Sequence, residues 1–189
     1  MAPASLNAMP EPLVVAFVPG VTPGKWERVW RERRPGGRLE LVPLSQRAAL
    51  TALHDGTAHM AIARDTPADD VWHAIALYRE EPVVVAARGS LVASLDDVAL
   101  GDLTHENLLE VDLQTGSGED AVELVAANVG IAVMPQSVAR ALSRKDVVAR
   151  RLRDAPGTSI SLVWPVDGAH PLSDAFIGIV RGRTANSSR

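Results

Sequence analysis

Three short apolar runs alternate with two helix-like segments in the first third of the chain. The runs occupy residues 13–18, 39–44 and 60–63. Thr22 and Ser45 follow the first two runs, and both residue types commonly cap the start of a helix. Strands and helices that alternate at this spacing predict a parallel sheet covered by helices. We therefore expect an α/β fold.

The second half of the sequence predicts a further unit of strands and helices. Extended segments are expected at residues 73–78 and 82–87, joined by a charged turn at Arg79–Glu81. Further strands are expected at residues 131–134, 147–152 and 159–164, and helices at residues 117–127, 137–143 and from Ser173 onward. Ser117 and Ser173 are expected to cap the first and the last of these helices. Ser117 and Asp120, three residues apart, resemble a capping box. The pattern as a whole indicates two α/β lobes.

The composition excludes several classes of protein. The 189 residues include no cysteine, so disulfides, thiolate metal sites and thiol nucleophiles are excluded. The net charge of −4 gives no positive field for nucleic acid or an acidic membrane, and no apolar run is long enough to span one. Residues 1–12 lack the features of a secretory signal. We expect residues 1–12 and 183–189 to be disordered, and the protein to be cytoplasmic.

No catalytic or cofactor motif stands out in the sequence. Residues 116–121 have the glycine spacing of a dinucleotide fingerprint, but no βαβ unit surrounds them. A flexible turn explains them better, although a helix start there could still receive a ligand carboxylate. His54 and His59 are separated by the helix end expected at Gly56, which argues against a shared metal site. The basic residues within 140–153 lack interleaved aromatics and indicate a solvated face. We expect no enzyme activity, no cofactor and no metal.

The carboxyl edge of the predicted sheet is the expected place for a ligand. In open sheets of this kind, ligands collect beyond the strand ends, where helix N-termini offer free N–H groups. Residues 19–22 follow the first strand, and residues 64–66 follow the third. Thr22, backbone donors and Arg64 would together hold a small anion. In the alternative interpretation, Thr22 only caps its helix and Arg64 only pairs with a nearby acid.

A family resemblance is carried by several segments in a fixed order. These segments are residues 17–20, 34–35, 39–41, 50–58, 78–85, 125–135 and 171–178. Their order and spacing, across residues 13–182, resemble the effector-binding domain of LysR-type transcriptional regulators. The resemblance implies two Rossmann-like lobes of the type 2 periplasmic-binding-protein kind, joined by two crossover segments.

The resemblance also implies where the lobes divide and where a ligand binds. Lobe I would comprise residues 13–84 and 159–182, and lobe II would comprise a shortened segment, residues 85–158. A small-molecule effector would lie in the cleft between them, and the family commonly pairs such domains into dimers. The residues implied to line the cleft are Val18, Pro19, Gly20, Val21, Thr22, Arg64, Asp65, Thr66, Pro135, Gln136 and Ser137.

Three departures from the family bear on function. The family's helix-turn-helix precedes this domain, but only twelve residues precede Leu13, so direct DNA binding by this chain is not expected. His59 stands where the family commonly has aspartate, which would alter a structural hydrogen bond or add a pH-sensitive group. The segment between Leu109 and Asn128 is shorter than in the family, so part of the lobe II cleft wall would be missing.

These observations favour a ligand-sensing module over two other functions. Its effector is expected to be a carboxylate or an aromatic acid, with no membrane contact. The alternative is a degenerate interaction protein of the same fold, which dimerises but binds no ligand. Trp26 and Trp30 would then be surface anchors, so their exposure separates the two hypotheses. An enzyme is disfavoured because no nucleophile with a matching base is visible.

Overall fold

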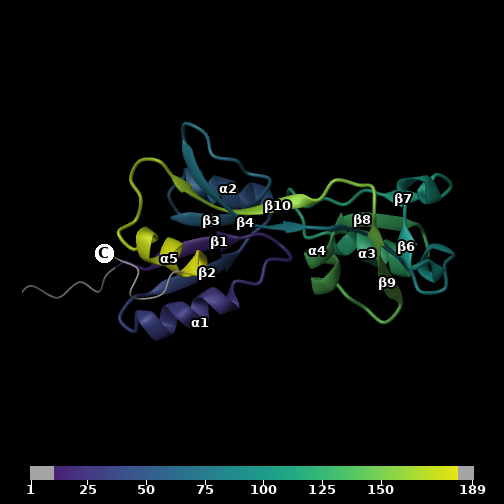
Figure 1. Cartoon of the computed structure of the whole chain (residues 1–189), viewed down its shortest axis with the longest axis horizontal. Helices are drawn as coiled ribbons and strands as arrows, with labels where there is room; N and C mark the ends of the chain where they lie inside the picture. The colour runs from purple at the N-terminus through teal and green to yellow at the C-terminus, as the bar shows by residue number, and fades with distance from the viewer. Residues whose placement is uncertain (1–10, 183–189) are drawn as a thin grey trace, which may run out of the picture.

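The computed structural model describes residues 11–182, which form two lobes lying side by side (Figure 1). Each lobe is built around a five-stranded sheet, so the predicted α/β class with two lobes is confirmed. Residues 1–10 and 183–189, where most of the predicted disorder falls, lie outside the described residues. Within residues 11–182, no helix has both the length and the apolar character needed to cross a membrane.

Lobe I contains a sheet with the strand order β2-β1-β3-β10-β4. Its elements are β1 (Leu13–Phe17), α1 (Gly24–Arg33), β2 (Leu39–Pro43), α2 (Gln46–His54), β3 (Met60–Arg64), β4 (Trp72–Glu80), β10 (Thr158–Pro165) and α5 (Ser173–Val180). β1 pairs in parallel with β2 and β3, as the sequence pattern predicts, whereas β10 is antiparallel to β3 and β4. The carboxyl ends of β1, β2 and β3 therefore lie together at one edge of the sheet.

Lobe II contains a sheet with the strand order β6-β9-β5-β8-β7. Its elements are β5 (Pro82–Ala87), η1 (Val92–Ser94), β6 (Asp97–Val98), η2 (Leu100–Leu103), β7 (Leu108–Leu109), α3 (Glu119–Ala126), β8 (Ile131–Pro135), α4 (Gln136–Ala141) and β9 (Val147–Leu152). Every residue of the central strand β5 is buried. Its side chains pack into a hydrophobic core on each face of the sheet, Val83 and Val85 on one face and Val84 and Ala86 on the other. This explains why the segment is a continuous apolar run.

The chain crosses between the two sheets twice. In the first crossing, Glu81 alone separates β4 from β5, and the second runs from the end of β9 to Thr158 at the start of β10. The prediction of a charged turn at Arg79–Glu81 is wrong, because Arg79 and Glu80 belong to β4. The Glu80 side chain is buried there in an ion pair. Residues 82–84, which we expected in lobe I, pair with β8 and β9 in the lobe II sheet.

Of the two helix caps predicted in the first half of lobe I, one is confirmed and the other is wrong. Ser45 is the N-cap of α2, and its Oγ accepts a hydrogen bond from the Ala48 N–H at 3.4 Å, as predicted. Thr22 does not cap α1, because the N-cap position is Pro23 and the helix begins at Gly24. The pyrrolidine ring fixes φ of Pro23 at −77°, close to the helical value, so the turn starts without a side-chain cap.

The serine caps predicted for α3 and α5 are wrong. Gly118 is the N-cap of α3 and has a φ of +82°, a conformation that glycine adopts without the steric penalty of a side chain. Ser117 lies one residue earlier, and its Oγ accepts a hydrogen bond from the Glu119 N–H at 3.4 Å. Ser173 is already the first residue of α5, and its buried hydroxyl has no hydrogen-bond partner among the described residues.

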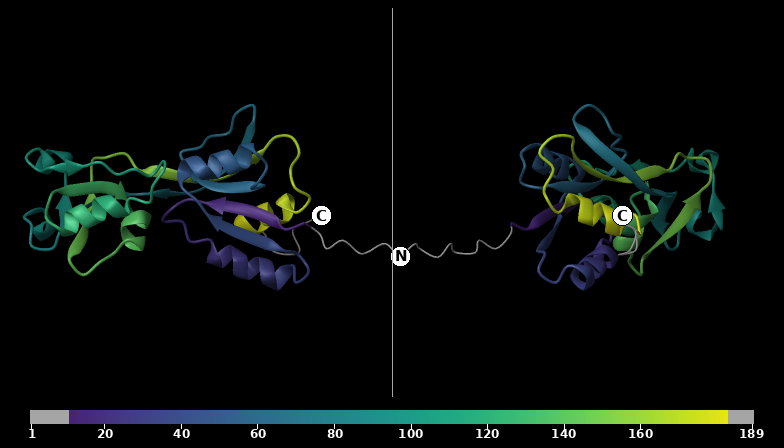
Figure 2. Two further views of the ribbon diagram at one scale, coloured as in Figure 1. Left: turned by 180° about the vertical axis from the view of Figure 1, so that it is seen from behind. Right: turned by 60° about the vertical axis from the view of Figure 1, so that its left-hand side comes forward.

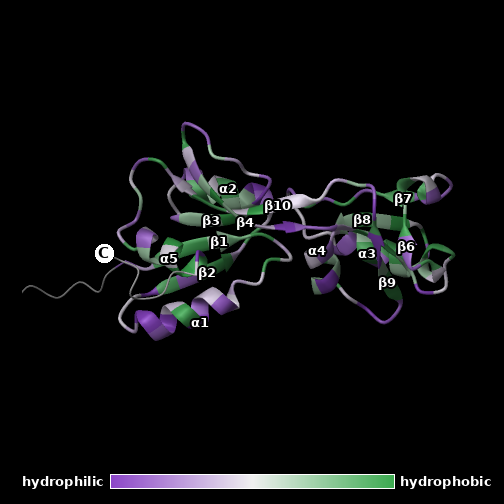
Figure 3. Ribbon diagram, viewed as in Figure 1, coloured by the Kyte–Doolittle hydropathy of each residue, from purple (hydrophilic) through white to green (hydrophobic). Residues whose placement is uncertain are grey.

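The helices cover the lobe I sheet on both faces. Figure 2 shows α1 and α5 on one face and α2 on the other, and Figure 3 shows hydrophobic strands at the centre of both lobes. Trp26 and Trp30 point inward from α1, with 6% and 2% of their surface exposed. The Trp30 ring packs against Phe176 of α5 at 6.0 Å, and its Nε1–H donates to the Gly37 carbonyl at 2.8 Å. Neither tryptophan is therefore a surface anchor.

His59 ties the loop before β3 to β1. Its backbone N–H donates to the Val14 carbonyl at 2.9 Å, and its Nδ1 accepts the Val14 N–H at 3.0 Å. The His170 ring lies 4.4 Å away between centroids. Burial lowers the pKa of His59 below its ordinary value of 6.5, His170 lowers it further, and Glu11 partly opposes both effects. Because Nδ1 accepts a hydrogen bond only when unprotonated, folding favours the neutral ring.

We expect His59 to make the stability of the protein pH-dependent. Its folded-state pKa is lowered, so its contribution is complete above pH 6.5 and is lost as the pH falls below that value. His59→Asn keeps an acceptor near Nδ1 but does not titrate. Urea midpoints should therefore fall more steeply for the native protein than for this variant between about pH 7.5 and about pH 5.5. His54→Asn, which removes an exposed histidine, should retain the native profile. Parallel profiles for the native protein and His59→Asn would contradict the prediction.

Candidate functional site

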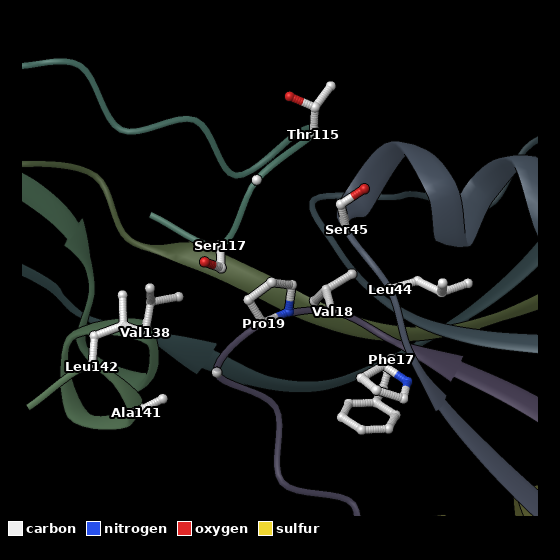
Figure 4. A pocket seen from close by; sticks show the side chains of 13 residues that line it. Phe17, Val18, Pro19, Leu44, Ser45, Thr115, Ser117, Val138, Ala141 and Leu142 are labelled. Atoms are coloured by element: carbon white, nitrogen blue, oxygen red, sulfur yellow. The ribbon is translucent and has the colours of Figure 1, made fainter. Parts of the chain in front are cut away.

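A cavity of about 470 Å³ lies between the lobes at the carboxyl ends of β1 and β2, and we refer to it as the cleft cavity. Lobe I contributes residues 17–20 and 43–45, and lobe II contributes residues 115–117 together with Val138, Ala141 and Leu142. Figure 4 shows the α4 side chains on one side, Val18 and Pro19 opposite them, and Ser117 between. The walls are mainly apolar, and the polar side chains that line them are the hydroxyls of Ser45, Thr115 and Ser117.

The loop that carries Thr115 and Ser117 has a defined turn. The Asp112 carboxylate accepts hydrogen bonds from the Gln114 N–H at 2.7 Å and the Thr115 N–H at 2.9 Å. It also accepts one from the Thr115 hydroxyl. These bonds favour the ionised form, and the Thr115 side chain is the main cause of the lowered pKa of Asp112. The turn is therefore held by its own side chains, although we expected it to be flexible.

The same loop of lobe II caps a helix of lobe I. The Leu113 carbonyl accepts the Gln46 N–H at 3.4 Å, and the Gln114 carbonyl accepts the Arg47 N–H at 2.8 Å. With the Ser45 hydroxyl on the next N–H, the first turn of α2 has three of its donors paired. The lobes are thus joined by backbone hydrogen bonds beside the cleft cavity as well as by the two crossings.

Gly20 brings the two lobes into direct contact on the other side of the cleft cavity. A Cβ at this position would lie 2.5 Å from Ser137 Oγ and 2.8 Å from the Val138 nitrogen, closer than a Cβ atom approaches its neighbours in folded proteins. Gly20 also has a φ of +85°, which disfavours any residue with a side chain. Glycine is therefore required here by both the backbone conformation and the contact with α4.

A buried ion pair lies behind this contact. Arg64 at the end of β3 and Glu80 at the end of β4 are 8% and 5% exposed, and Arg64 Nε donates to Glu80 Oε2 at 2.7 Å. Arg64 Nη2 also donates to the Pro19 carbonyl at 2.7 Å and to Ser137 Oγ at 3.2 Å. Glu80 in turn accepts hydrogen bonds from the Ser137 and Thr158 hydroxyls, the latter at 3.1 Å. The pair therefore links both lobes and both crossings.

We expected Arg64 to hold a ligand anion, but in the structure its side chain is paired with Glu80. Its guanidinium is buried against Glu80, which agrees with the alternative interpretation that Arg64 pairs with a nearby acid. Asp65 is also engaged, because its Oδ1 accepts from the Ser159 N–H at 2.7 Å and from the Ser159 hydroxyl at 3.1 Å. The Thr66 hydroxyl donates to the Arg64 carbonyl at 2.8 Å.

The other residues implied to line the cleft separate into three groups. Val18, Pro19 and Gly20 line the cleft cavity. Thr22 and Ser137, again with Gly20, line a second hollow beside the start of α1. Val21 and Pro135 are buried, and Gln136 is exposed with its N–H donating to the Glu81 carbonyl at 2.9 Å.

Several residues that line the cleft cavity were not predicted from the sequence. Leu44 and Ser45 follow β2, so the strand-end argument that selected residues 19–22 would also have found them had it been applied there. Residues 116–121 were interpreted as a flexible turn whose helix start could still receive a ligand carboxylate, and Gly116 and Ser117 of this segment line the cavity together with Thr115. Val138 and Leu142 carried no signal, because their role depends on how α4 of lobe II is placed against lobe I.

The described residues do not assemble an obvious catalytic or metal centre. Within residues 11–182, no group of three His, Asp or Glu side chains gathers as a metal ion would require. Glu80 contacts the Ser137 hydroxyl, but its carboxylate is neutralised by Arg64 and does not resemble a free general base. What the structure provides at this place is a mainly apolar cavity lined by both lobes.

We expect Glu80→Gln to destabilise the protein strongly, because it leaves the buried Arg64 charge without a counter-ion. Urea denaturation should show a loss of about 3 to 5 kcal/mol in the free energy of unfolding. Arg64→Met combined with Glu80→Leu should cost less, since it removes both charges. Glu81→Gln is the matched control: Glu81 pairs with Arg151 at 3.5 Å on the surface, and its loss should cost less than about 1 kcal/mol. Equal losses for Glu80→Gln and Glu81→Gln would refute this account of the pair.

Comparisons with solved structures show the same fold. The BenM effector-binding domain with its effector benzoate has a TM-score of 0.76 at 18% identity, with 90% of each chain covered. A Corynebacterium glutamicum OxyR mutant has a TM-score of 0.75 at 19% identity, covering 94% of this chain and 65% of that one. Full-length CbnR in complex with its target DNA has a TM-score of 0.70 at 18% identity, covering 90% and 70%.

Sequence comparison identifies the family. No curated protein sequence matches the chain significantly. The model of the LysR substrate binding domain matches residues 25–116 and 109–185. These two matches overlap at residues 109–116, the loop that lines the cleft cavity and the segment expected to be shortened. Since the matches extend over most of the chain, this protein belongs to the LysR substrate binding domain family.

Proposed function

We propose that the cleft cavity binds a small carboxylate with an apolar or aromatic body, and that this domain senses it for LysR-type transcriptional regulation in the cytoplasm. The observation that carries the proposal is a cavity of about 470 Å³ lined by both lobes at the carboxyl ends of β1 and β2. This volume is typical of small-molecule sites, and strand ends are where α/β sheets bind ligands. The proposal assigns no DNA contact to residues 11–182.

The apolar walls support an effector with a hydrophobic body. Phe17, Val18 and Leu44 line the cavity from lobe I, and Val138 and Leu142 line it from lobe II. Removing apolar surface from water on both sides of a flat ligand gives most of the binding free energy in such sites. A highly polar effector would leave these walls without a favourable contact.

The polar groups at the cavity support a carboxylate at one end of the effector. The hydroxyls of Ser45 and Ser117 line it, and no charged side chain does. Among the described residues, the Gly116 and Ser117 N–H groups donate no hydrogen bond within the protein. Free N–H groups and hydroxyls are suitable donors for a single carboxylate. The BenM domain of similar fold is described with benzoate, an aromatic carboxylate, which supports this class by analogy.

Binding between the lobes would give the domain a means of signalling. A ligand that contacts both lobes favours the arrangement in which they are close, and so shifts the balance between open and closed states. The interaction-protein alternative loses its expected surface anchors, because Trp26 and Trp30 are both buried. The cleft cavity also persists although we expected part of the lobe II wall to be missing.

We also propose that two copies of the domain pair, as the family resemblance implies. Large apolar side chains are exposed at the far end of lobe II, including Leu108 at 61% and Val129 at 48%. Light scattering should give about twice the chain mass of 20.1 kDa at micromolar concentration. Replacement of both residues by Ser should lower this mass if that end of lobe II is the contact. A native mass of one chain would exclude pairing under these conditions.

A matched pair of substitutions at Ser45 tests the effector site. Both Asp and Asn cap helices as well as Ser does, so Ser45→Asp and Ser45→Asn should fold alike and differ mainly by one charge in the cavity. Isothermal titration with benzoate and related aromatic acids should detect binding to the native protein. Ser45→Asp should weaken it by about tenfold or more, through repulsion of the carboxylate, and Ser45→Asn should change it little. No binding across such a panel, or equal affinity in both variants, would overturn the proposal.

A further inference from the structure

A second hollow, of about 320 Å³, lies between the lobes beside the start of α1, and we refer to it as the α1 hollow. Lobe I contributes Gly20, Thr22, Lys25, Trp26 and Tyr78, and lobe II contributes Ser137, Arg140 and Ala141 of α4. Gly20 and Ala141 line the cleft cavity as well. The α1 hollow and the cleft cavity are therefore adjacent, and both border the contact between the lobes at Gly20.

The α1 hollow is lined by two cations from different lobes. Lys25 lies on α1, with its Nζ 4.7 Å from the centre of the Trp26 ring, and Arg140 lies on α4. Among the described residues, neither forms an ion pair, and no carboxylate lines the hollow. The carboxylate of Glu80 lies buried nearby, but Arg64 already neutralises it. Two unpaired positive charges that face one hollow repel each other unless an anion lies between them.

Neutral donors at the hollow add to the attraction for an anion. The Thr22 hydroxyl forms no hydrogen bond within residues 11–182, and the Gly24 N–H at the start of α1 is also unpaired there. Burial raises the pKa of the Tyr78 hydroxyl above its ordinary value, with a further contribution from Glu80, so this group stays a protonated donor. The positive end of the α1 dipole acts in the same direction.

We propose that the α1 hollow binds a small dianion, either a phosphoryl group or a short dicarboxylate, with Lys25 and Arg140 on opposite sides of it. This site differs in chemistry from the cleft cavity, where no charged side chain lines the walls. Because its two cations come from different lobes, the bound dianion also stabilises the arrangement in which the lobes are close. Gly20 and Ala141 are shared, so occupation of the α1 hollow changes effector affinity in the cleft cavity, and the reverse.

Calorimetric titration of the full chain with inorganic phosphate and, separately, with succinate tests this proposal. Low ionic strength is needed because salt screens charges that are exposed in the free protein. Lys25→Gln combined with Arg140→Gln should weaken binding of the dianion by about tenfold or more. Arg34→Gln combined with Arg153→Gln is the control, because it removes one exposed cation from each lobe outside the hollow. Its net charge therefore equals that of the Lys25/Arg140 variant. This control should bind like the native protein.

Each outcome decides part of the proposal. Binding of phosphate alone identifies a phosphoryl ligand, and binding of succinate alone identifies a dicarboxylate. No binding of either dianion, or equal affinity in the native protein and the Lys25/Arg140 variant, overturns the site. If that variant is not folded by its thermal transition, Lys25→Gln alone should still weaken binding. Benzoate titration of the Ser45 variants reports on the cleft cavity separately, so failure of one site is distinguishable from failure of the other.

Discussion

The ion pair between Arg64 and Glu80 is the interaction on which the arrangement of the two lobes depends. A charge with 8% or less of its residue exposed is costly to leave unpaired, so the ends of β3 and β4 are fixed relative to each other. The same two side chains hold Pro19, Thr158 and Ser137, which belong to three further segments of the chain. Both crossings and the start of α4 therefore meet at one point, and the cavities form around it.

The two cavities beside this point have complementary chemistry. In the cleft cavity, apolar side chains and hydroxyls line the walls without any charged side chain, whereas Lys25 and Arg140 line the α1 hollow without any acid. The helix α4 separates the two and contributes to both. Under the two proposals made above, α4 borders both sites, so a movement of this helix would alter both walls together and transmit the occupancy of one site to the other.

Local patterns in the sequence predicted most elements, because apolar periodicity and helix signals depend on near neighbours. The strand predicted at residues 147–152 matches β9, and Ser45 caps α2 as expected. The prediction failed where distant contacts decide the structure. Arg79–Glu81 was predicted as a charged turn because Arg64, the partner that buries Glu80, is 16 residues away and leaves no local signal. Val138, Ala141 and Leu142, at and just after α4, were missed for the same reason, since lobe placement leaves no local pattern.

The capping of α2 by the backbone of lobe II has a consequence for how the lobes separate. The Leu113 and Gln114 carbonyls take hydrogen bonds from the Gln46 and Arg47 N–H groups, so separation exposes two donors and two acceptors at once. Unlike apolar surfaces, these groups tolerate exposure only if water reaches them immediately. Opening of the domain is therefore a hydration event as much as a rotation. Osmolytes that are excluded from exposed peptide groups should therefore favour the arrangement in which the lobes are close.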